Sequence, residues 1–205
     1  GTSQSLDLDS DRGEYIRAAG NFALGVGDFF YANGSLGLEL STQTVNLADA
    51  TDDNPNGTAV VTDAILIGGT VNQAFAGINY LEEDGTPDNP DKIGIELQGG
   101  ELGLAILQGR EYATEPLAVN ADALTWTTLE AEVDTAALVG IDGITLAADS
   151  VDVAINQVDG LSAGMDSANY VVDYDQADTD VEIPLGPSQS DGLQARELGI
   201  AGDRG

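Results

Sequence analysis

The feature of this chain that most constrains its fold is an alternation of residue types that begins at Ile16. Every second residue from Ile16 to Val26 belongs to the series Ile, Ala, Gly, Phe, Leu and Val, whereas Arg17 and Asn21 fall between them. Successive side chains of a β-strand point to opposite faces, so a period of two is typical of a strand with one apolar face. We therefore expect a sheet whose strands share that apolar face.

Two turn signals follow this pattern. Gly27-Asp28 and Asn33-Gly34 are dipeptides that favour two-residue hairpin turns. A hairpin closed at the first turn pairs Val26 with Phe29, and the second turn keeps the same side chains on the same face. The segment 15–47 is therefore predicted to be a three-stranded antiparallel meander. The aromatic residues expected in its core are Phe22, Phe29 and Tyr31.

The pattern recurs twice more within the chain. The segments FFYANGSLGLEL (29–40), IELQGGELGLAI (95–106) and ITLAADSVDVAI (144–155) align without gaps, with apolar residues at equivalent places. Each is predicted to be a hairpin with a two-residue turn at its centre. Before the third copy, a loop over 140–143 would pair Val139 with Ile144. The acidic, turn-rich segments 51–57, 82–92 and 173–180 are predicted to be exposed loops.

The expected fold class is all-β. We expect an elongated antiparallel sheet of meanders and hairpins, curled or solenoid-like, with one apolar face. That face must be covered by a second sheet, by curling into a tube, or by something outside the chain, and the sequence does not choose among these.

The two ends of the chain resemble each other. Gly1-Thr2-Ser3-Gln4-Ser5 returns as Gly186-Pro187-Ser188-Gln189-Ser190, and Asp11-Arg12-Gly13 returns as Asp203-Arg204-Gly205. The offsets are 185 and 192 residues, because five residues separate the two matching parts at the start and twelve at the end. Self-similarity at such a period indicates a tandem array. We therefore expect a junction segment at 1–13 that is equivalent to 186–205, a single β-rich unit at 14–185, and the start of the next repeat at 186–205.

Acidic residues outnumber basic ones by 36 to 6, which gives a formal net charge of -30. Nucleic acid and anionic membrane surfaces would repel such a chain, so neither is expected as a partner. The chain has no His and no Cys, which excludes Ser-His and Cys-His nucleophile pairs, and we expect no enzyme. No run of roughly 18 apolar residues is present, so insertion into a membrane as a helix is not expected.

Calcium is the one cofactor that the residue types favour. Dense carboxylates in flexible loops are the oxygen ligands that Ca²⁺ requires. The alternative is that these carboxylates are only solvated surface charges. The candidate ligands are Asp7, Asp9, Asp11, Glu82, Asp84, Asp88 and Asp91.

The segments GEYIRAAGNFALGVGDFFYANGSLGLEL (13–40) and AALVGIDGITLAADSVDVAINQ (136–157) resemble repeats of very long, acidic, glycine- and aspartate-rich bacterial tandem-repeat proteins that are secreted or displayed on the cell surface. The resemblance implies an extracellular array, with calcium-dependent rigidity of the kind seen in large secreted adhesins. It carries over no functional residue.

These observations predict a structural repeat module of an extracellular fibre, sheath or large adhesin, which contacts copies of itself end to end and has calcium or a cell surface as a further partner. The alternative is a binding module whose apolar face forms a groove for lipid or another apolar ligand. A third, less favoured possibility is a carbohydrate-active β-solenoid enzyme, which would need a cleft with convergent carboxylates.

Overall fold

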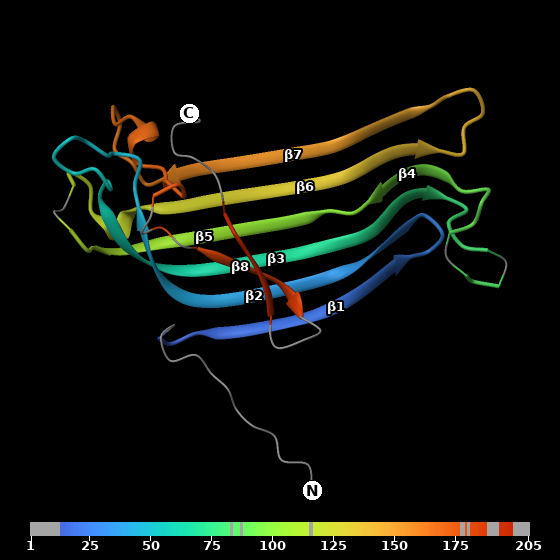
Figure 1. Ribbon diagram of the computed structural model, residues 1–205, viewed down its shortest axis with the longest axis horizontal. Helices are drawn as coiled ribbons and strands as arrows, with labels where there is room; N and C mark the ends of the chain where they lie inside the picture. Colours follow the sequence, from blue (N-terminus) through green and yellow to red (C-terminus); the bar gives the residue numbers. More distant parts are fainter. Residues whose placement is uncertain are drawn as a thin grey trace, which may run out of the picture.

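A computed structural model shows an all-β chain, as predicted (Figure 1). The structure describes residues 13–82, 84–86, 88–114, 117–176, 179, 181–187 and 193–198. Within these residues, no helix is long and apolar enough to span a membrane. The strands are β1 (Ile16–Val26), β2 (Phe30–Asn46), β3 (Ala59–Ile78), β4 (Ile93–Gln98), β5 (Glu101–Tyr112), β6 (Thr125–Val139), β7 (Leu146–Asp159), β8 (Glu182–Pro187) and β9 (Leu193–Glu197), with short 3-10 turns η2 (Ala121–Ala123) and η3 (Ser167–Asn169).

Strands β1 to β7 form one antiparallel sheet in which neighbours in sequence are mostly neighbours in space. β4 and β5 share one position between β3 and β6, because Gln98 pairs with Gln73 of β3 and Glu101 pairs with Thr70 of the same strand. The seven strands therefore fill six positions. β8 and β9 pair with each other and lie across one side of this sheet (Figure 1).

The first predicted turn is confirmed, but its register differs by one residue. Gly27 has a positive φ of 55°, and the turn spans Gly27 to Phe29, so that Val26 pairs with Phe30 rather than with Phe29. A one-residue slip moves side chains to the opposite face. The core prediction was therefore wrong for Phe29, which is 57% exposed in the turn, while Tyr31 lies on the opposite side of the sheet from Phe22.

The predicted turn at Asn33-Gly34 was wrong, since both residues lie inside the 17-residue strand β2. Pairing with β3 shifts register at this point, which is a β-bulge or irregularity rather than a reversal of the chain. The equivalent central turns predicted for the other two segments, at Gly99-Gly100 and Ala148-Asp149, were wrong in the same way. They interrupt the β4–β5 position and β7 without reversing them.

The hairpin between β6 and β7 is confirmed, again with a shifted register. Leu138 pairs with Leu146 and Ala137 with Ala147, whereas the sequence pattern paired Val139 with Ile144. The connection between the two strands covers residues 140–145, two residues more than the predicted loop over 140–143.

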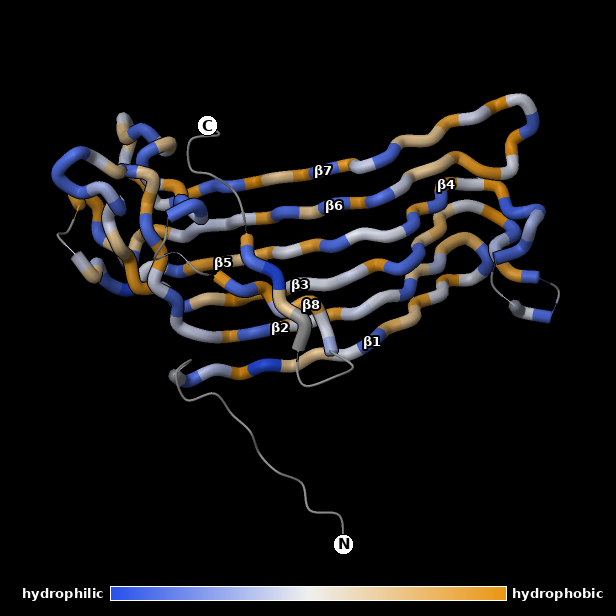
Figure 2. The backbone as a smooth tube through the Cα atoms, in the orientation of Figure 1, coloured by the Kyte–Doolittle hydropathy of each residue, from blue (hydrophilic) through white to orange (hydrophobic). Residues whose placement is uncertain are grey.

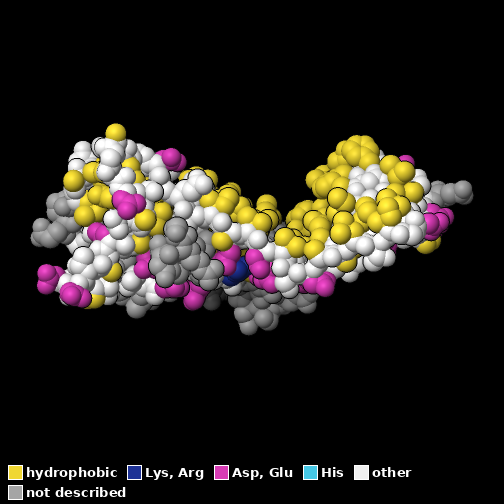
Figure 3. All heavy atoms as spheres, turned by 90° about the horizontal axis from the view of Figure 1, so that it is seen from above, with side chains coloured by type: hydrophobic (Ala, Val, Ile, Leu, Met, Phe, Trp, Pro, Cys, Tyr) yellow, Lys and Arg dark blue, Asp and Glu magenta, His cyan; other side chains and the backbone are white. Residues whose placement is uncertain are grey.

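The irregular positions of β2, β4–β5 and β7 lie in line across the sheet. Gly99, Gly100 and Ser150 have φ values of 64°, 159° and 55° there, and the register shift at Asn33/Gly34 continues the line. Along this line the sheet bends, and Figure 3 shows two arms that meet at an angle. The centres of the three aligned sequence segments therefore all lie at the same bend, in every second strand position of the sheet.

The two sides of the sheet differ. We call the side that carries Leu66, Leu107 and Trp126 the packed face, and the side that carries Leu36, Ile65 and Ile95 the open face. The core lies on the packed face, where residues 47–58, 113–114, 117–124, 160–176, 179 and 181 cover one arm of the sheet. Its largest side chain, Trp126, is fully buried, and its Nε1 donates a hydrogen bond to the Tyr170 carbonyl oxygen at 2.6 Å.

Strand β8 packs on the middle of the packed face. A Cβ at Gly37 or at Gly68 would overlap Pro184 or Ile183, so these glycines allow the backbones to approach closely. Ser35 Oγ donates a hydrogen bond to the Leu185 carbonyl oxygen at 2.6 Å. Residues 186, 187 and 193–198, which the sequence pattern assigned to a following repeat, thus belong to a hairpin that lies on the chain's own sheet.

Candidate functional site

The open face is a set of apolar rows that cross the sheet. Strand pairing places one residue of each strand position in each row. From β1 to β7 the five rows are Val26, Phe30, Ala76, Ile95, Leu138, Leu146; Leu24, Ala32, Ala74, Leu97, Ala136, Ala148; Gly20, Leu36, Gly69, Leu102, Ala131, Val153; Ala18, Leu38, Ile67, Leu104, Leu129, Ile155; and Ile16, Leu40, Ile65, Ile106, Thr127, Gln157. None of these residues carries a charge.

No described element packs on the open face. Large side chains there remain accessible to solvent: Leu146 is 64% exposed, Ile95 54%, Leu36 48% and Ile65 39%. With strands about 4.8 Å apart and about 3.3 Å of rise per residue, five rows over six positions cover on the order of 800 Å². A typical monomeric protein exposes contiguous apolar patches of only about 300–600 Å², and patches above that size mark interaction sites.

The bend hollows the open face. In Figure 3 hydrophobic side chains gather over both arms on the hollow side of the molecule. Figure 2 shows hydrophobic positions recurring along the strands, as alternation within each strand requires. Next to the bend lies the row with most of the small residues, which contains Ala32, Ala74, Ala136 and Ala148. Small side chains at this place leave the hollow unfilled.

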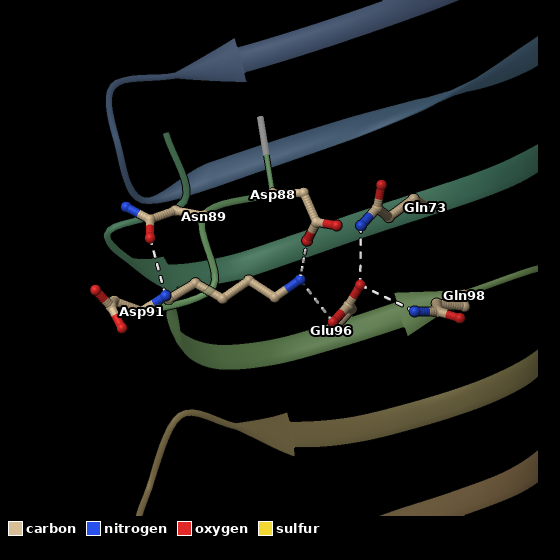
Figure 4. Close-up of polar contacts among 7 residues, drawn as sticks. Gln73, Asp88, Asn89, Asp91, Glu96 and Gln98 are labelled. Carbon is tan, nitrogen blue, oxygen red and sulfur yellow. Dashed lines mark hydrogen bonds and ion pairs between the residues drawn. The ribbon is translucent and has the colours of Figure 1, made fainter. Parts of the chain in front are cut away.

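The packed face carries a polar network on the other arm (Figure 4). Lys92, the one lysine of the chain, pairs with Asp88 and with Glu96, whose Oε2 lies 2.9 Å from its Nζ. Glu96 Oε1 also accepts hydrogen bonds from Gln73 at 2.8 Å and from Gln98 at 3.0 Å. Burial opposes the charge of Glu96, but these donors outweigh it, so the pKa of its carboxyl group lies below its ordinary value.

An aromatic stack supports this network. The Tyr80 ring lies between Tyr31 and Phe75, with centroid distances of 4.9 Å and 4.8 Å. Lys92 Nζ lies about 6 Å from the Phe75 and Tyr80 centroids, within cation–π reach. Tyr80 is 1% exposed, and desolvation of its hydroxyl group raises its pKa. Because every charge in the network is paired, we interpret it as a clamp that holds the β3–β4 connection on the sheet.

The predicted metal ligands are not brought together in the described part of the chain. Asp7, Asp9 and Asp11 lie outside the described residues. Asp84 accepts a backbone hydrogen bond from Thr86, and hydrogen bonds from that residue lower its pKa, while Asp88 pairs with Lys92. Glu82 and Asp91 lie in the same connection. No group of three acidic side chains there is arranged to hold a metal ion.

A second acidic region lies at the bend on the packed face. Glu101, Glu132 and Asp134 line a polar groove of about 640 Å³ together with Asn72. Arg196 of β9 lies beside it, 2.9 Å from Glu130 and 3.9 Å from Glu101. The arginine thus links the β8–β9 hairpin to the sheet.

Sequence patterns predicted the apolar face of β1 and its extension into other strands, but not which face would be covered. In β2 the covered residues include Ser35, Gly37 and Glu39, which are small or charged. Small residues at alternate positions were the available signal, since they mark where another backbone approaches closely. Glu39 is 1% exposed and pairs with Arg17 at 2.8 Å.

In comparisons with known proteins, the chain matches no family model, no curated protein and no solved structure.

Proposed function

We propose that this protein is a non-catalytic structural module of an extracellular fibre, sheath or large adhesin, and that its open face is covered by an apolar protein surface in the assembled state. The observation that carries this proposal is the size of the open face: on the order of 800 Å² of sheet with uncharged side chains, of which large ones such as Leu146 and Ile95 are exposed to solvent. A standard protein–protein interface buries about 800 Å² on each partner.

The distribution of charge supports an assembly role. A formal net charge of -30 keeps isolated chains soluble and apart, yet no charged residue falls in the five rows of the open face. Charges first appear one row beyond Ile65, where Asp63 pairs with Arg110 at 3.4 Å. An uncharged centre with a polar rim is the usual composition of a protein interface.

Cysteine labelling tests the proposal, because the chain has no cysteine of its own. Val153 and Ala154 are neighbours on β7, both exposed, with Val153 on the open face and Ala154 on the packed face. We expect a maleimide to label Val153→Cys at least tenfold more slowly in the assembled material than in the dilute isolated chain. Ala154→Cys is the matched control, and its rate should change less. Equal rates for the two variants in the assembled material would refute the proposal.

A second candidate function is favoured by the hollow shape of the open face. The bend and the alanine row beside it would accommodate an elongated apolar ligand such as a lipid acyl chain. Native mass spectrometry of chain purified in the presence of lipid should then show a bound species. Ala74→Leu, which fills the hollow, should reduce the bound fraction several-fold, whereas Ala154→Leu on the packed face should not. An unloaded chain in every preparation would exclude this candidate.

A further inference from the structure

We infer that the outer edge of β1 pairs with the outer edge of β7 in a second copy of this chain, so that successive copies continue one antiparallel sheet. This goes beyond the proposed function, because it concerns the edges of the sheet and not its open face. The contact is made by two edge strands that are distant in the sequence.

Both edges are long and available in the described part of the chain. β1 has 11 residues and β7 has 14, each pairs with a single neighbouring strand, and most residues of both are exposed. Natural sheets protect such edges with lysine, proline or short strands, because unpaired N–H and C=O groups recruit other strands. Neither β1 nor β7 contains a lysine or a proline.

The directions of the two strands fit this contact. The sheet has six antiparallel strand positions with β1 and β7 at its two ends, so β1 and β7 run in opposite directions. A second copy displaced sideways by the width of the sheet therefore brings its β1 antiparallel to β7 of the first. One row of paired residues crosses the sheet from Asn21 on β1 to Asp152 on β7. Asn21 of the second copy would therefore lie beside Asp152 of the first. The bend and the apolar rows would then run on from copy to copy.

The distribution of charge favours β1–β7 pairing over symmetric pairing between the β7 edges of two copies. β7 carries Asp149, Asp152 and Asp159 and no basic residue, so two β7 edges would bring carboxylates together. β1 has no acidic residue, and its one charged side chain, Arg17, is neutralised by its pairing with Glu39. Within a chain of net charge -30, β1 is thus an edge that an acidic strand can approach without repulsion. A contact between two different edges leaves one edge of each copy free for the next, so it extends into a filament unless its rotation closes a ring.

Disulfide trapping tests the inference with the full chain. The double variant Asn21→Cys/Asp152→Cys, oxidised at high concentration, should give a covalent ladder that extends beyond dimers. Asn21 and Asp152 both lie on the packed face, and Ala154→Cys and Asp149→Cys on the same face allow for register shifts of two residues in one direction and three in the other. The control Asn21→Cys/Val153→Cys places the second thiol on the opposite face and should give at least tenfold less cross-linking. Far-ultraviolet circular dichroism of each variant establishes that it folds.

The single variants separate the alternatives. A covalent dimer from Asn21→Cys alone, with no longer species from any double variant, would show symmetric β1–β1 pairing and overturn the inference. Dimers from Asp152→Cys alone would show β7–β7 pairing with the same consequence. Absence of any ladder from a chain that sediments as a monomer at high concentration would also overturn it. Each of these outcomes would overturn the inference alone. The proposed function would still stand if Val153→Cys were protected from labelling in the assembled material.

Discussion

Gly34 of β2 faces the backbone of Thr70 in β3 so closely that a Cβ at position 34 would overlap the Thr70 carbonyl oxygen. The glycine therefore serves the approach of two strands at the bend. Its φ is not in the left-handed region, so the requirement is for space and not for an unusual backbone conformation.

We expect Gly34→Ala to lower the free energy of unfolding by about 1–3 kcal/mol, the usual cost of overpacking a tight contact. Gly20→Ala is the matched control, because a Cβ there meets no atom within 4 Å and the residue is likewise in a strand. Urea denaturation of both variants measures the difference. Equal stability of the two variants would contradict the role of Gly34 at the bend.

Removal of the lysine should weaken the clamp on the β3–β4 connection. Lys92→Met keeps the apolar stem over Phe75 and Tyr80 but leaves Glu96 without its cation. We expect a loss of about 1–3 kcal/mol in the free energy of unfolding, as for a buried acceptor that loses a charged donor. Lys92→Arg should recover part of it. A Lys92→Met chain as stable as the parent would show that the network is dispensable.

The same network predicts a dependence of stability on acid. The pKa of Glu96 is lowered in the folded chain, so its ionised form stabilises the fold above the ordinary value of 4.5. This contribution is lost as the pH falls through the lower folded-state pKa. The stability difference between the parent and Glu96→Gln should thus be constant near pH 7 and shrink below about pH 4.5. Chemical denaturation at several pH values measures it, and a difference that grows in acid would contradict the assignment.

Calcium binding by the acidic segments stays a prediction. If the carboxylates around Asp84 and Asp91, or those at 7–11, bind Ca²⁺, millimolar calcium should raise the melting temperature by mass action, since extracellular sites often bind at about 10⁻⁴ to 10⁻³ M. The variant Asp84→Asn/Asp91→Asn tests the first region separately. Identical melting curves in calcium and in chelator would leave these residues with a role in solubility alone.

The sequence patterns located the strands and the irregular positions, but they did not show how the chain runs at those positions. Alternation from Ile16 predicted a strand with one apolar face, because side-chain direction in a strand follows from the backbone alone. Asn33-Gly34 predicted a turn, yet the two residues lie in a continuous strand, opposite a register shift that leaves Asn72 of β3 as the extra residue. Only the position of β3 beside β2 decides between a turn and a continuous strand.

The sequence by itself determined the all-β class, the existence but not the register of the first and last hairpins of the sheet, and the three equivalent segments. These depend on interactions between near neighbours along the chain. Tertiary structure alone decided that the three segments mark one bend, that β8 lies against Gly37 and Gly68, and that the apolar rows face solvent. Which face of an alternating strand is covered depends on where distant segments such as 181–187 pack, and no local pattern in the strand specifies their position.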